Sequence, residues 1–193
     1  MRAADPCEAD RFLALLKPIE RDLENYCRRL IWEPQEASDA LQNAVMRAFA
    51  AFDRYVETAS FRAWIFKILT REAFALNRKH ARIARHEFQL DPEELAGLAL
   101  AGDSDQRDQP LSAQALQEIL ETNLSAGLKS LTETERAVLL LRAIGGLRYR
   151  EISESLEIPL GSVMGNLSRA RQKMRACIAR SPKQSVCKNR GEL

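Results

Sequence analysis

The chain has 193 residues, of which 46% are apolar and 29% charged, a balance that excludes global disorder and predicts a soluble protein of one or two domains. No apolar run approaches the ~20 residues that span a membrane, and the N-terminus lacks the apolar core of a secretory signal. We therefore expect no membrane insertion and a cytoplasmic location. The net charge is only +2, but it is +6 over residues 62–85 and −8 over residues 87–121.

The first half of the chain reads as three helices. Apolar residues recur at spacings of three and four over residues 8–31 and 35–53, and again from Phe61 toward His86, as on one face of a helix. Residues 53–59 read as a loop, and the hydroxyl of Ser60 is placed to cap the third helix. We expect these helices to share one core, in a domain of residues 8–90.

Residues 91–111 are acidic, contain Gly, Ser and Pro, and lack a sustained apolar stripe, which predicts a flexible linker. A second domain is predicted over residues 112–180, followed by a disordered polar tail of residues 181–193. Its expected helices cover residues 112–128, 136–144, 148–156 and 161–179, and Thr132 with Glu135 forms a capping box before the second of them. The predicted fold class is all-α, with two small helical domains joined by an acidic linker.

The last two predicted helices have the pattern of a helix-turn-helix. They are short, the turn Glu157–Pro159 is tight, and the second helix has an inward apolar stripe that includes Val163, Leu167 and Ala170. The opposite face is polar or small, as a surface facing a DNA groove must be. A hairpin in an ordinary helical bundle has the same spacing, so this pattern alone leaves both interpretations open.

Neither an enzyme nor a metal site is indicated. The four cysteines (Cys7, Cys27, Cys177 and Cys187) form no Cys-x-x-Cys pair and lie far from both histidines in the sequence. We interpret them as reduced thiols, with Cys27 on a buried helix face. No nucleophile–base pair or phosphate-binding loop stands out, so we expect no catalytic residue, no metal and no cofactor.

Two segments then identify a family resemblance. The C-terminal part of the chain contains the segments GLRYREI at 146–152, IPLGSV at 158–163 and LSRAR at 167–171. Together these segments closely resemble region 4 of extracytoplasmic-function (ECF) sigma factors, which belong to the sigma-70 family. The segments PQEASDALQNAVMRAF at 34–49 and SFRAWIFKI at 60–68 resemble region 2 of the same factors. Two matches in the correct order are far more specific than a lone helix-turn-helix.

The resemblance implies a transcription initiation factor that binds bacterial core RNA polymerase, recognises the −10 and −35 promoter elements and assists strand opening. The implied polymerase contacts are Asp39, Gln42, Asn43 and Arg47. The implied −10 contacts are Arg62, Trp64, Lys67, Arg71, Arg78, Lys79 and Arg82, and the implied −35 contacts are Arg148, Tyr149, Ser162, Met164, Gly165, Asn166, Ser168, Arg169, Arg171 and Lys173. The polar residues proposed to contact polymerase would also suit an ordinary solvated helix face. Phe61 and Trp64 fit a role in the hydrophobic core better than a role in stacking on DNA bases.

Five positions depart from the family pattern. Met164, Gly165 and Asn166 stand where the family commonly has a basic residue, a serine and an arginine, which predicts a weaker phosphate grip and an unusual sequence preference. Glu157 stands where the family often has glycine, and Asn43 stands where an acid is common.

Two alternatives to an initiation factor are weighed, and the altered recognition helix motivates the second of them. One is a helix-turn-helix regulator that works without polymerase, and the other is a sigma-like decoy that does not initiate transcription. The resemblance also implies promoter DNA and an anti-sigma factor as partners. The acidic linker is interpreted either as a nucleic-acid mimic within polymerase or as a solvated tether.

Overall fold

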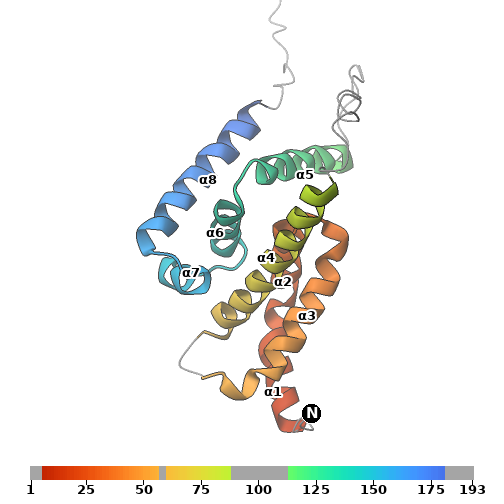
Figure 1. Cartoon of the computed structure of the whole chain (residues 1–193), viewed down its shortest axis with the longest axis vertical. Coiled ribbons are helices and arrows are strands. Elements are labelled where there is room, and N and C mark those ends of the chain that lie inside the picture. The colour runs from red at the N-terminus through yellow and green to blue at the C-terminus, as the bar shows by residue number, and fades with distance from the viewer. Residues whose placement is uncertain (1–5, 57–59, 88–112, 181–193) are drawn as a thin grey trace, which may run out of the picture.

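The computed structural model describes residues 6–56, 60–87 and 113–180, and every regular element in these ranges is a helix (Figure 1). This confirms the predicted all-α class. The helices are α1 (Pro6–Leu16), α2 (Glu20–Leu30), α3 (Ala37–Ala50), α4 (Phe61–Glu87), α5 (Ala113–Lys129), α6 (Glu133–Ala143), α7 (Tyr149–Leu156) and α8 (Leu160–Arg180). Short 3₁₀ turns cover Lys17–Ile19, Pro34–Glu36 and Phe52–Arg54. The predicted linker and C-terminal tail lie outside the described residues.

The prediction of one helix over residues 8–31 was wrong, because the 3₁₀ turn Lys17–Ile19 separates α1 from α2. Pro18 is the physical reason: it has no backbone N–H to donate, and its ring clashes with the preceding turn of an α-helix. The apolar spacing continues across the break, since Leu16, Ile19 and Leu23 are all buried. Periodicity alone therefore concealed the interruption.

The core of the N-terminal half lies between α2, α3 and α4. Leu23 and Tyr26 from α2 and Phe66 from α4 are buried, and the rings of Tyr26 and Phe66 meet edge to face at 5.1 Å. The Tyr26 hydroxyl forms a 2.6 Å hydrogen bond with Thr70. Cys27 is buried in α2, as predicted, and burial raises the pKa of its thiol to about 12.

The chain enters α4 through a cluster of aromatic side chains. Ser60 caps the helix by accepting a hydrogen bond from the Ala63 N–H at 3.3 Å, as predicted. The Phe61 ring is buried and contacts Phe12 at 5.7 Å, and the Trp64 ring lies 5.2 Å from Tyr55. These contacts favour the interpretation of both rings as core residues.

In the C-terminal half, α6 and α8 cross around buried Val138, Leu141, Val163 and Leu167, and α5 and α7 flank them. The predicted capping box at the start of α6 is present. The two halves of the chain also pack on each other: α6 lies against α2, and α7 lies against α4 (Figure 1). The sequence did not predict this packing.

Candidate nucleic-acid interface

The turn between α7 and α8 is built by local hydrogen bonds. Glu157 ends α7 with φ 57° and ψ 40°, the left-handed conformation. The Ile158 N–H then donates to the Ser153 carbonyl at 3.1 Å, and the Pro159 carbonyl accepts from the N–H of Val163, also at 3.1 Å. The turn therefore does need the positive φ that glycine adopts freely. For glutamate, this conformation costs about 1–2 kcal/mol.

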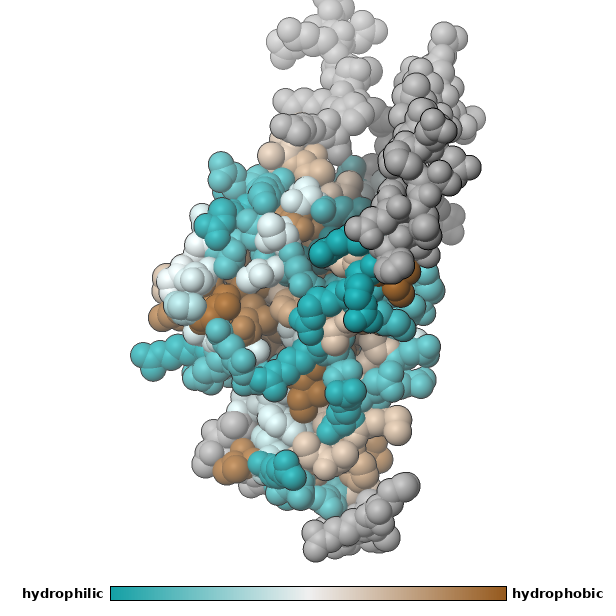
Figure 2. Space-filling view, viewed as in Figure 1, coloured by the Kyte–Doolittle hydropathy of each residue, from teal (hydrophilic) through white to brown (hydrophobic). Residues whose placement is uncertain are grey.

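A groove runs along one side of α8, next to the start of α7. It is lined by Tyr149, Met164, Leu167, Ser168, Arg171, Gln172 and Arg175. Apolar surface interrupts the polar surface at the left of Figure 2, on the side where α7 and α8 lie. Met164 and Leu160 are 48% and 38% exposed. Exposed methionine among cations suits a DNA groove, where phosphates flank apolar thymine methyl groups.

The first turn of α7 is fixed by the residues around Tyr149. The Arg142 guanidinium lies 5.5 Å from the centre of the Tyr149 ring and donates to the Leu147 carbonyl at 3.0 Å. The Glu151 carboxylate accepts from the Arg148 N–H at 2.6 Å. The Arg148 side chain is exposed beside this turn, as the predicted DNA contact requires.

The front of α8 offers few free polar groups. The Asn166 amide donates to the Ser162 carbonyl at 2.8 Å, and its oxygen accepts from Arg169 at 2.9 Å. Both ends of this amide are therefore bonded within α8. A Cβ added to Gly165 would meet only the end of the Arg169 side chain, at 3.4 Å, so packing does not require glycine there.

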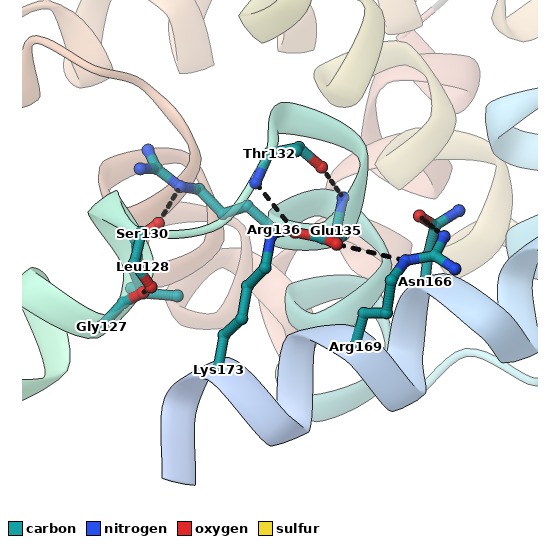
Figure 3. Close-up of polar contacts among 9 residues, drawn as sticks. All are labelled: Gly127, Leu128, Ser130, Thr132, Glu135, Arg136, Asn166, Arg169 and Lys173. Atoms are coloured by element: carbon teal, nitrogen blue, oxygen red, sulfur yellow. Dashed lines mark hydrogen bonds and ion pairs between the residues drawn. The ribbon is translucent and has the colours of Figure 1, made fainter. Parts of the chain in front are cut away.

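Two cations of α8 converge on one buried carboxylate (Figure 3). Glu135, whose side chain is only 4% exposed, accepts from Lys173 at 2.7 Å and from Arg169 at 3.3 Å. It also accepts from the Thr132 N–H at 3.0 Å. Burial raises the pKa of Glu135, but the hydrogen bonds from Lys173 and Thr132 outweigh it and lower the pKa overall. The sequence revealed only the capping role of Glu135.

The basic residues of α4 fall into two groups. Arg62, Lys67 and Arg71 are bonded to the C-terminal half of the chain. Farther along the helix, the other predicted −10 contacts are exposed to solvent: Arg78, Lys79 and Arg82. The predicted set thus shares one helix, and only its first group is bonded to the C-terminal half of the chain in this conformation. Trp64 is half-buried in the aromatic cluster.

The predicted polymerase contacts form an exposed row on α3. Asp39, Gln42, Asn43 and Arg47 all face solvent. Arg47, whose side chain is 70% exposed, pairs with Glu72 of α4 at 2.9 Å. A groove between α3 and α4 is lined by Glu36, Asp39, Ala40, Asn43, Glu72, Ala75, Leu76 and Lys79. The row is continuous and accessible, as a docking surface must be.

Within the described residues, no group of three or more His, Cys, Asp or Glu side chains is arranged to hold a metal ion. None of the described helices is long and apolar enough to cross a membrane.

Comparison with known families assigns both halves of the chain. A family model described as sigma-70 region 2 matches residues 15–83, and one described as sigma-70 region 4 matches residues 122–174. The chain belongs to the sigma-70 family. Together the two matches cover more than half of its length, include α2, α3, α6 and α7 completely, and contain most of α4. The exposed row of α3 therefore lies in region 2, and the helix-turn-helix lies in region 4.

Similar proteins identify the branch of the family. The chain is 28% identical to the RNA polymerase sigma-H factor of Pseudomonas aeruginosa over 147 residues, which cover 75% of this chain and 74% of that protein. It is 26% identical to the ECF RNA polymerase sigma factor SigW of Bacillus subtilis over 170 residues, covering 87% and 89%. The protein is an ECF sigma factor that directs RNA polymerase to promoters, and it is not an enzyme.

Two solved structures share the fold. The sigma factor RpoE in complex with the anti-sigma factor NepR, from Bartonella quintana, aligns with a TM-score of 0.67 at 19% identity, covering 89% of this chain and 99% of that one. CnrH in complex with the cytosolic domain of CnrY aligns with a TM-score of 0.62 at 20% identity, covering 89% of each chain.

Proposed function

We propose that this sigma factor binds core polymerase through the α3 row, the −10 element through α4, and the −35 element through α7 and α8, and that it assists strand opening. The observation that carries the proposal is the separation of these surfaces. The α3 row is exposed on region 2, and a groove lined by cations and Met164 lies between α7 and α8 on region 4. Opening needs cations that hold single-stranded phosphates, which the basic residues of α4 supply.

The test is run-off transcription with the full-length protein, core polymerase and fragmented genomic DNA. We expect transcripts from a defined set of promoters, which share one −10 and one −35 sequence. Failure to bind core polymerase would remove both the initiation role and a decoy role that acts on polymerase. Since polymerase and promoters work in the bacterial cytoplasm, the proposal also places the protein there.

Asn166 limits the base contacts that the front of α8 can make. Its amide is bonded within α8 at both ends, and Gly165 offers no side chain. The front of the helix therefore presents little for base readout in this conformation.

We further propose that the cations of α8 have two different roles. Arg171 is exposed in the groove, whereas Lys173 is bonded to Glu135. Each phosphate contact contributes about 0.9 to the slope of log affinity against log salt. Arg171→Ala should therefore lower the slope for duplex −35 DNA by about one, and Lys173→Ala should change it by much less. Fluorescence anisotropy across a salt series measures both slopes, and equal changes would contradict the division.

An anti-sigma factor is proposed as a regulatory partner. One of the solved structures described above is a complex of a sigma factor with an anti-sigma factor, and the other is a complex of CnrH with the cytosolic domain of CnrY. The shared fold supports the proposal that this chain is held in the same way. Co-purification of the tagged full-length protein from its own cell, followed by sequencing of the bound chain, tests it directly.

A further inference from the structure

Region 4 covers one end of the helix that we assign to −10 DNA. The Arg62 side chain donates to the carbonyl of Gly145 at 2.5 Å and to that of Ile144 at 2.9 Å. Lys67 donates to the Glu154 carbonyl at 3.1 Å. A third cation of α4, Arg71, forms an ion pair with the Glu157 carboxylate. Three cations of α4 are therefore bonded to region 4. The positive charge that would hold a DNA strand is thus partly occupied by the chain itself.

Glu157 is an unusual residue for the place that it occupies. Among the described residues it is the one non-glycine with a positive φ, a conformation in which glycine is free of strain. Its carboxylate pairs with Arg71 and lies 3.5 Å from the Lys67 ammonium. The hydrogen bond and charge of Arg71, followed by those of Lys67, lower the pKa of Glu157. Glu157 keeps a strained backbone conformation, and its side chain bonds region 4 to region 2. This combination points to a function for the side chain.

The packed arrangement cannot occupy both promoter elements at once. Their names place the −10 and −35 elements about 25 base pairs apart, which is about 85 Å along B-DNA at 3.4 Å per step. In the structure α7 lies directly on α4, and a helix of 27 residues is only about 40 Å long at 1.5 Å per residue. Promoter binding at both elements therefore requires α7 and α8 to leave α4.

We propose that the free protein is autoinhibited: region 4 docks on the DNA-binding face of α4, and Glu157 latches it there through Arg71 and Lys67. Polymerase and promoter DNA compete with this latch. The paired side chains are well exposed, Arg71 at 58% and Glu157 at 65%, so salt screens their attraction and the latch opens readily. The inhibitory part of the proposal rests on the assignment of α4 to DNA, whereas the closed state itself does not.

Small-angle X-ray scattering of the full chain tests the closed state. At low salt we expect a larger radius of gyration for Glu157→Gln and Glu157→Gly than for the wild type. Glycine suits the left-handed turn, so Glu157→Gly should fold at least as well as the wild type. Glu154→Gln is the matched control, because Glu154 is an exposed acid on the same helix and contributes only its backbone carbonyl to the contact. The exchanged pair Arg71→Glu with Glu157→Arg should restore the compact state. Equal radii for the wild type, both Glu157 variants and the control would overturn the latch.

Affinity for a fluorescent single-stranded 12-mer with the identified −10 sequence tests the inhibition. Freeing Arg71 and Lys67 should raise the affinity of Glu157→Gln and Glu157→Gly about three- to ten-fold, with no change for Glu154→Gln. Expansion without any gain in affinity would show that the contact does not inhibit DNA binding, and would overturn that part of the proposal. If no variant binds the 12-mer, both the assignment of α4 to DNA and the inhibitory role are wrong. The scattering measurements then test by themselves whether Glu157 holds region 4 against α4.

Discussion

Replacing Gly145 with alanine is expected to destabilise region 4 by about 3 kcal/mol or more, near the upper end of what overpacking produces. A Cβ at this position would lie 2.5 Å from the Leu141 carbonyl oxygen and 2.8 Å from Cδ1 of Leu147. The carbonyl belongs to the backbone of α6, so it cannot rotate away as a side chain would. The end of α6 must move, and the packing of buried Leu141 and Leu147 moves with it.

Gly146→Ala is the matched control, because it tests the conformation of the neighbouring residue without the clash. Gly146 has φ 65°, and a Cβ there would meet only the Arg62 Nε, at 3.9 Å. The expected cost is the left-handed strain alone, about 1–2 kcal/mol. Hydrogen exchange of the α6, α7 and α8 amides measures each change within region 4. A larger loss for Gly146→Ala than for Gly145→Ala would mean that the close approach does not govern this turn.

Local signals in the sequence predicted the local structure well. The capping box of Thr132 and Glu135 and the cap at Ser60 are both present, because a cap depends on residues only three positions apart. The left-handed turn at Glu157 could also be anticipated, since the family often has glycine there. The missed break at Pro18 was equally local. The proline outweighs the apolar spacing, because a missing N–H ends a helix regardless of which face is buried.

Contacts between distant segments had no such signal. Arg71 and Glu157 are 86 positions apart, and Arg62 and Gly145 are 83 apart. The family resemblance implied that six basic residues of α4 contact DNA. It could not show that three of them meet region 4, because that depends on how two separately folded domains pack.

The pairing of Glu135 with Lys173 was hidden for the same reason, as 38 positions separate the two residues. A sequence can therefore identify which charges are available. The tertiary structure decides which of them remain free for a partner.

Glu135→Gln is expected to destabilise region 4 by about 1.5–3 kcal/mol at neutral pH, the range for hydrogen bonds to a charged group. Glutamine keeps the size of the side chain and can still accept from the Thr132 N–H. It loses the charge that holds Arg169 and Lys173 on α6. Denaturant unfolding followed by hydrogen exchange in α6 and α8 measures the loss. The exposed acid Glu121, on α5, supplies the control Glu121→Gln, which should change stability by less than about 0.5 kcal/mol.

The same pair of variants predicts a dependence on pH. Because the folded pKa of Glu135 lies below its ordinary value of 4.5, its stabilisation is complete above that value and is lost as pH falls through the folded pKa. The wild type and Glu121→Gln should therefore lose region 4 stability steeply below about pH 4.5, whereas Glu135→Gln should lose less over the same interval. Parallel curves of region 4 stability against pH for the three proteins would mean that another group causes the loss of stability in acid. Convergence of Glu135→Gln with the wild type at low pH would identify the buried carboxylate as the group that ties α8 to α6.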